Sequence, residues 1–248
     1  DLRQNVTFGY ADRFDEKYDL VRSVRKGKFK YIRNYQPFNV DGLYNFYRYK
    51  MLAYKEWYNL FQNGKLNEVQ SQFFKPRTPE ALYNIEEDPH ETKNLANDDN
   101  YNETLTGLRN ELNNHLISIN DLSFLPEPHL LQNGLDDIVD YSEKNKDLIK
   151  SLIEISDLML YDYNEVSSQI KDALNNDNPW VRYWGLIVSS TFGDLALENN
   201  EKINFIFEND SENLVRMRAA EFMLLNNIEI SDSKINSLLV RANFEAEA

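Results

Sequence analysis

The sequence predicts an α+β protein, with a small antiparallel sheet and packed helices in the first half and an all-α region in the second. Residues 18–35 alternate between apolar and polar side chains, as half-buried strands do, whereas residues 137–248 repeat apolar side chains every three or four positions, as amphipathic helices do. The charge divides in a similar way. Residues 1–76 carry 14 Lys and Arg against 8 Asp and Glu, and residues 77–248 carry 13 against 33. We therefore expect two regions of different architecture.

The strands of the first region are expected around a hairpin. Lys26-Gly27 separates the two alternating runs, and glycine supplies the positive φ that a tight turn needs. A further short strand is predicted at residues 81–85, and the sequence EEDP at 86–89 predicts a turn after it.

Helices are expected between and after these strands. From Leu43 aromatic residues fall at three- and four-residue spacing, which predicts a helix that Asn63-Gly64 ends, and a short second helix is expected before Pro76. Exposed aromatic rings would offer a platform for sugars or bases, but a stripe at helical spacing is more often core packing, and core packing is the preferred interpretation. A further helix is predicted at residues 102–120.

The second region contains a repeat. Pro179 suits the first turn of a helix, and the Val181-Arg182 pair that follows recurs 34 residues later as Val215-Arg216. This pattern resembles HEAT-type helical repeats. The two prolines and the glycine of residues 121–136 indicate a linker or wrapping segment. We therefore predict an α+β region at 1–126, a linker at 127–136 and helical repeats at 137–248.

Composition excludes several kinds of site. The chain has no cysteine, which excludes disulfides, thiolate ligands and cysteine nucleophiles. Its three histidines, His90, His115 and His129, lie far apart in the sequence, and single histidines rarely bind metal. No apolar run approaches the ~20 residues that a membrane span needs. The first residues lack the features of a signal peptide, so the chain begins as an excised piece of a longer protein would.

Four stretches of the first region carry a resemblance to a known family. They are residues 13–16 (RFDE), 18–25 (YDLVRSVR), 30–34 (KYIRN) and 82–96 (LYNIEEDPHETKNLA), and their order and spacing resemble the C-terminal subdomain of the formylglycine-dependent sulfatases. The resemblance implies a small antiparallel sheet of about four strands, crossed by a helix and docked against a larger catalytic domain. Bacterial members of the family with HEAT-like repeats after this subdomain would account for the second region.

The chain departs from the family in one respect that decides its activity. The family's nucleophile is a cysteine or serine in a short motif with arginine, matured to formylglycine, and its calcium is held by Asp and Asn clusters of the catalytic domain. Neither motif is present here, so no catalytic residue, metal ligand or cofactor is assigned within the chain. Two smaller departures, Ala81 and Asn84 in place of the usual Glu and Asp, fall at structural positions. The implied parent is a sulfuric ester hydrolase, and this chain alone is expected to be inactive.

Two arginines are the candidate substrate-binding residues. Arg13 and Arg22 lie in the stretches that resemble the family, nearest the expected junction with the catalytic domain, and cationic side chains suit a sulfated carbohydrate. The opposing interpretation, that they are ordinary solvated strand residues, is equally weighted. For Lys26, Lys28 and Lys30 the preferred interpretation is a lysine-protected sheet edge.

Three functions compete at this point. The first is a C-terminal piece of a sulfatase that completes the fold and shapes the substrate pocket, with its own catalytic domain as partner and an external, periplasmic or extracellular, location implied by the family. The second is a non-catalytic interaction module built on helical repeats. Nucleic-acid binding by the basic first half ranks last, because the remainder of the chain carries a balance of −20 and neither an RNP-like nor a helix-turn-helix signature is present.

Overall fold

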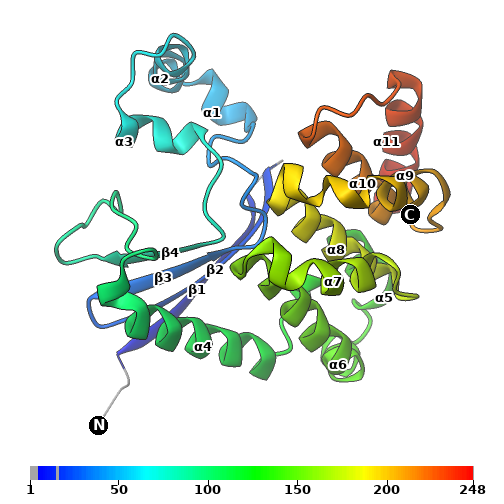
Figure 1. Cartoon of the computed structure of the whole chain (residues 1–248), viewed down its shortest axis with the longest axis horizontal. Coiled ribbons are helices and arrows are strands. Elements are labelled where there is room, and N and C mark those ends of the chain that lie inside the picture. Colours follow the sequence, from blue (N-terminus) through cyan, green and yellow to red (C-terminus); the bar gives the residue numbers. More distant parts are fainter. Residues whose placement is uncertain (1–4, 15–16, 248) are drawn as a thin grey trace. The chain divides into compact units, whose positions relative to one another are not determined.

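The computed structural model describes residues 5–14 and 17–247, which belong to two compact units, 1–115 and 116–248 (Figure 1). The first unit holds four strands and the second is helical throughout, so the predicted α+β class is confirmed. The prediction of domain boundaries at 126 and 136 stays a prediction, although the expected linker contains a short helix, α5 (Glu127–Asn133). No helix in the described part of the chain is long and apolar enough to cross a membrane.

The sheet of the first unit is antiparallel, with its strands in the order β1-β2-β3-β4. Gly27, at φ +59°, forms the turn between β2 and β3, as predicted. A register shift between Ala11 and Arg13 interrupts the pairing of β1 with β2 at Asp12. The four strands are β1 (Val6–Phe14), β2 (Lys17–Lys26), β3 (Phe29–Asn34) and β4 (Glu80–Asn84).

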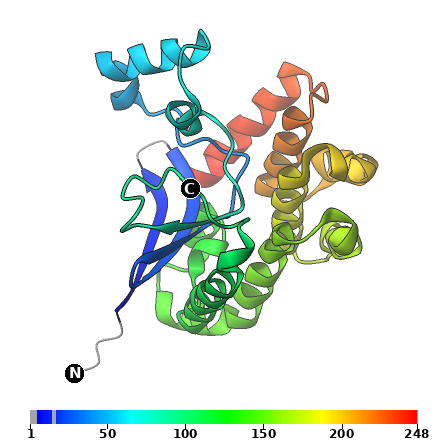
Figure 2. The ribbon, with the colours of Figure 1, turned by 60° about the vertical axis from the view of Figure 1, so that its left-hand side comes forward.

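One face of the sheet is covered by α4 (Asn102–Ser118), which runs along it in Figures 1 and 2. Val24, Tyr31 and Leu82 stand opposite one another on neighbouring strands and point to this face, where all three are fully buried. They meet a stripe of buried leucines on α4, spaced three and four residues apart as the sequence predicts. This covered face is the core of the first unit.

Three short helices lie between β3 and β4: α1 (Phe46–Lys50), α2 (Leu52–Gln62) and α3 (Glu68–Ser71). The prediction of one continuous helix from Leu43 is wrong, because Met51 is extended at ψ 128° and separates α1 from α2. The break lets the hydroxyls of Tyr49 and Tyr54 both donate to the carbonyl of Gly42, each at 3.3 Å. Gly64 follows the end of α2 at φ +63°, as predicted.

In the described residues, the second unit is built from six longer helices and α5. Trp184 of α8 is buried at its centre and donates its indole N–H to the carbonyl of Phe124 at 2.7 Å. Pro179 lies in the first turn of α8, as predicted, and the side chain of Asn178 caps this helix. The longer helices are α6 (Ile138–Ser156), α7 (Tyr163–Leu174), α8 (Pro179–Phe192), α9 (Asn200–Asn209), α10 (Asn213–Leu225) and α11 (Asp232–Glu247).

Small side chains bring these helices close together. A Cβ on Gly185 of α8 would lie 3.1 Å from the Cβ of Ala173 on α7, so a larger residue would require the two helices to shift by a few tenths of an ångström. The arginines of the predicted repeat join different elements. Arg182 binds both carboxylate oxygens of Asp210 at 2.7 and 2.9 Å, and Arg216 donates to the carbonyl of Phe207. The assignment of these helices to HEAT-like repeats stays a prediction.

Candidate functional site

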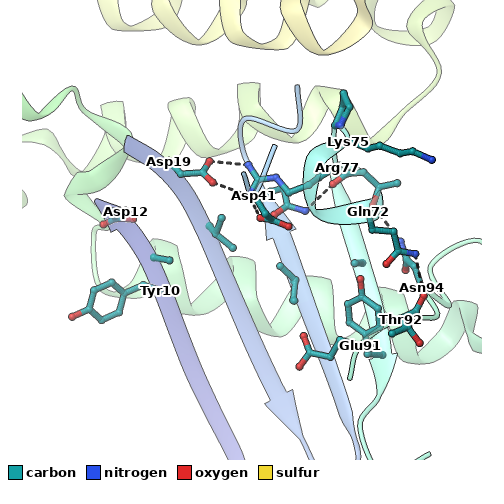
Figure 3. A pocket seen from close by; sticks show the side chains of 18 of the residues that line it. Tyr10, Asp12, Asp19, Asp41, Gln72, Lys75, Arg77, Glu91, Thr92 and Asn94 are labelled. Carbon is teal, nitrogen blue, oxygen red and sulfur yellow. Dashed lines mark hydrogen bonds and ion pairs between the residues drawn. The ribbon is translucent and has the colours of Figure 1, made fainter. Parts of the chain in front are cut away.

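The face of the sheet opposite α4 carries an open cavity of about 830 Å³ (Figure 3). Its floor is made of strand residues that alternate with the buried core residues, because successive side chains of a strand point to opposite faces. Ala11, Val21 and Asn34 stand side by side across β1, β2 and β3, and Ile32 and Ala81 across β3 and β4. Alanine at two of these places leaves room above the floor.

One wall of the cavity is an ion-pair cluster around Arg77. Its guanidinium binds both carboxylate oxygens of Asp19, at 2.7 and 2.9 Å, and lies 3.5 Å from the carboxylate of Asp41. It also donates to the carbonyl of Gln36 at 3.0 Å, while its Nε is buried with no hydrogen-bond partner among the described residues. Asp19 and Arg77 are both well buried, so removal of either side chain would leave the charge of the other without compensation.

The opposite wall is the stretch that follows β4. Glu91 adopts φ +53° and accepts from the ammonium of Lys30 at 2.7 and 2.9 Å. Asp88 accepts from the backbone N–H groups of Thr92 and Lys93, at 2.7 and 2.8 Å, and the pKa of Asp88 is lowered, mainly by the bond from Lys93. These acidic side chains hold a turn, as the sequence predicts.

Asn94 closes the outer edge of β4. Its side-chain oxygen accepts from the N–H of Leu82 at 3.0 Å, and its amide group donates to the carbonyl of Glu80 at 3.3 Å. The backbone N–H of Leu95 donates to the carbonyl of Leu82 at 2.8 Å. The side chain of Asn94 and the backbone of Leu95 therefore bond to N–H and C=O groups of β4 that would otherwise be free to pair with another strand.

Charged side chains make up much of the lining of the cavity. Five carboxylates and three cations are among its lining residues. Burial is the main cause of the raised pKa of Tyr83, which also lines the cavity. Within the described part of the chain no group of three or more His, Cys, Asp or Glu could hold a metal ion.

The two candidate arginines occupy different places. Arg13 lines the cavity, with its guanidinium carbon 5.8 Å from the centre of the Tyr18 ring. Arg22 is not among the lining residues. It is buried, binds the carboxylate of Asp12, and donates to the carbonyl of Val21 at 2.9 Å. Substrate binding by either arginine stays a prediction.

The hairpin lysines are paired with carboxylates. Lys26 lies 2.8 Å from Glu111, Lys28 lies 4.0 Å from Glu87, and Lys30 binds Glu91. The lysines are therefore held in ion pairs, but β2 and β3 are inner strands of the sheet, so the prediction that these lysines protect a sheet edge is wrong. Arg77 could not be found from sequence, because its partner Asp19 lies 58 residues upstream and no local spacing joins the two.

The three histidines have structural surroundings. The ring of His115 stacks on Phe8 at 3.7 Å between centres, and His129 is hydrogen-bonded to the hydroxyl of Tyr141 at 2.7 Å. Burial lowers the pKa of His129. His90 lies at the surface in the turn after β4.

Comparison with known proteins finds a relative for part of this chain. It is similar to an ulvan-active sulfatase of Formosa agariphila, with 44% identity over 122 residues. The matched stretch is 49% of this chain and 20% of that protein, so the chain spans about a fifth of the length of the curated relative it matches. No protein-family model matches the chain.

Proposed function

We propose that this chain is a C-terminal part of a sulfatase that acts on a sulfated glycan, and that it completes the fold and shapes the substrate pocket of a catalytic domain that lies outside residues 1–248. The 44% identity over 122 residues supports the sulfatase assignment. The four-stranded antiparallel sheet with a helix across one face agrees with the subdomain that the sequence resembles.

The open face of the sheet carries the proposal for the partner. A floor that includes Ala11, Val21 and Ile32 is an apolar surface that a single-domain protein would cover, as α4 covers the other face. Polar groups surround this floor, which is the usual arrangement of a docking interface. The proposed occupant is the protein's own catalytic domain, with the Arg13 side of the cavity nearest the substrate.

The reaction would use groups of that catalytic domain. Sulfate-ester cleavage needs a nucleophile directed at sulfur and cationic groups that offset the charge of the sulfuryl oxygens. Asp19 and Asp41 do not suit calcium, because the guanidinium of Arg77 already binds them. We therefore place the formylglycine and the calcium ligands in the catalytic domain, and assign no step of the reaction to residues 1–248.

The helical unit has a proposed architecture as well. We propose that its α7–α8 and α9–α10 pairs are HEAT-like repeats. The buried Val181 and Val215 support this assignment, as do the helix-joining bonds of Arg182 and Arg216.

Sulfate release tests the proposed function. The chain alone and the same chain joined to the polypeptide that precedes it in its gene are purified and assayed on ulvan. We expect sulfate release from the longer protein only. Turnover by the chain alone, or a gene in which a start codon directly precedes Asp1, contradicts the proposal.

The docking face has its own test. Val21→Arg places a long cation in the cavity and is expected to weaken capture of the separately produced preceding polypeptide by at least about tenfold. Asn59→Arg, on the exposed surface of α2, adds the same side chain away from the cavity and serves as the control. Equal capture by both variants would show that the catalytic domain docks elsewhere.

A further inference from the structure

The segment at α1 and the start of α2 has an unusual composition. Residues 43–55, LYNFYRYKMLAYK, contain five aromatic residues and three cations and no Asp or Glu. The whole chain has 41 Asp and Glu among 248 residues, a net charge of −14. A stretch of 13 residues without a carboxylate is therefore a local basic region on an acidic protein, and it lies in the part of the chain that forms α1–α3 in Figure 2.

Several aromatic rings of this segment are exposed. Tyr44 is 57% exposed and Tyr47 is 70% exposed, and Phe46 lies between them in the sequence and is about half exposed. Tyr54, in contrast, is 6% exposed and packs into the cluster of rings with Trp57 and Phe74. The preferred interpretation of these aromatics as core therefore holds for Tyr54 and for Tyr49, which packs against it, and not for Phe46 and Tyr47.

The cations of the segment lack carboxylate partners. Among the described residues no ion pair involves Arg48, Lys50 or Lys55. Arg48 donates to the backbone carbonyl of Asp41, and the carboxylate of that aspartate faces Arg77 instead. This differs from the β2–β3 hairpin, where each lysine faces a glutamate.

Rings and cations lie together on α1. The ammonium of Lys50 is 3.7 Å from the centre of the Phe46 ring, one helical turn earlier. Phe46 and Tyr47 meet edge to face at 6.0 Å. We call Tyr44, Phe46, Tyr47 and Lys50 the aromatic platform.

We propose that the aromatic platform binds a sulfated polysaccharide, as a second contact for the glycan outside the catalytic centre. Exposed tyrosine rings offer an apolar face for sugar C–H groups and a hydroxyl for hydrogen bonding, and lysine offers a cation for a sulfate ester. The choice of a sulfated ligand rests on the proposed function. Charge complementarity favours a polyanion over a protein surface as the ligand. The cations of the segment form no ion pair with a carboxylate, so no such pair has to break before they bind an anion.

Binding to dextran sulfate, with unmodified dextran as the matched neutral polymer, tests the proposal. At low salt we expect the whole chain to bind dextran sulfate and not dextran, with an affinity that falls as salt is added, because exposed charges are screened. The net charge of −14 opposes this binding, so a positive result requires a local cationic site.

Two matched double variants locate the site. Tyr47→Ala with Lys50→Ala removes one exposed ring and one cation from the platform and is expected to weaken binding by about tenfold. Tyr161→Ala with Lys150→Ala removes the same residue types from exposed positions of the helical unit. This variant is expected to change the affinity for dextran sulfate by less than about twofold. Circular dichroism confirms that both variants are folded.

The outcomes separate this inference from the proposed function. Absence of binding to dextran sulfate, or equal binding by the two variants, overturns the role of the platform even when the longer protein releases sulfate. If the platform variant instead loses capture of the preceding polypeptide while binding dextran sulfate normally, the platform is a protein docking surface and the proposal is wrong. This test does not use sulfate release. If the longer protein releases no sulfate, the result for binding to dextran sulfate still stands.

Discussion

The two faces of the four-stranded sheet differ in how they are completed. On the covered face Val24, Tyr31 and Leu82 are fully buried beneath α4, a helix of the same chain. On the open face Val21 and Ile32 are only partly buried and form the floor of a cavity. Because both faces belong to the same strands, strand pattern alone does not decide which face a chain covers by itself. We infer that the covered face stabilises the unit and that the open face serves a partner.

Polar contacts follow the same division. The covered face ends in a network in which Tyr31 donates to Glu80 at 2.9 Å and Arg109 of α4 binds both carboxylate oxygens of Glu80. The open face has Arg77 and Asp19 in the cavity wall. The first network lies between the sheet and α4, whereas the second faces the open cavity.

Removal of a core side chain from the covered face has the largest expected effect. Leu82→Ala deletes a fully buried side chain and should lower the free energy of unfolding by about 3 kcal/mol, from lost burial and the cavity left behind. Ile32→Ala, on the partly buried open face, is the matched variant and should cost about 1 kcal/mol or less. Hydrogen exchange of the β3 amides measures the free energy of opening for this unit alone.

Equal losses for the two variants would contradict the division between the faces. The open face would then be as important to the stability of the isolated chain as the covered one.

Loss of the cavity-wall cation comes second in size. Arg77→Ala leaves the buried carboxylate of Asp19 without its bidentate partner and should cost about 2 kcal/mol, less than for a fully enclosed pair because the cavity admits water. Asp41→Asn is the control, since this half-exposed carboxylate lies 3.5 Å from Arg77 and its loss should cost about 0.5 kcal/mol or less. The two variants are compared by urea denaturation, monitored through hydrogen exchange of the β2 amides.

A larger loss for Asp41→Asn than for Arg77→Ala would show that the weaker contact of Arg77 is the important one. The cavity wall would then depend on Asp41 rather than on Asp19.

Local signals predicted much of the fold. The β2–β3 hairpin, β4 and α4 are confirmed, because alternation, a glycine turn and a leucine stripe all act within a few residues. The break at Met51 was not predicted, and it accompanies hydrogen bonds from the hydroxyls of Tyr49 and Tyr54 to the carbonyl of Gly42, which no local period shows. Tertiary contacts of this kind override helical period.

The candidate site was less accessible to sequence. Arg13 was singled out and lines the cavity, but Arg77 was not, because its partners Asp19 and Asp41 are distant in the sequence and belong to other segments. The pairing of the hairpin lysines with Glu87, Glu91 and Glu111 likewise becomes visible only when the chain is folded. Long-range ion pairs leave no period that a sequence can show.

The smallest expected effect concerns the two tyrosines, one on each face. Burial raises the pKa of Tyr31, and its hydrogen bond to Glu80 adds to this. Burial is also the main cause of the raised pKa of Tyr83 on the open face, where no hydrogen bond of its hydroxyl joins it to another described residue. At neutral pH, Tyr31→Phe should therefore cost about 1 kcal/mol, and Tyr83→Phe about 0.5 kcal/mol or less.

Alkaline pH sharpens this difference. Above a pH of about 10 a tyrosine of the unfolded chain loses its proton while a folded tyrosine with a raised pKa keeps it. The unfolded state then binds fewer protons than the folded state, so the wild type loses stability as pH rises. Phenylalanine at position 31 removes that loss. The difference in the free energy of unfolding between the wild type and Tyr31→Phe should therefore become smaller between pH of about 9 and 11. Tyr83→Phe should become more stable than the wild type over the same range. A gap for Tyr31→Phe that stays constant across this range would mean that the phenol ionises equally in both states, and Tyr31 would then not be sealed beneath α4.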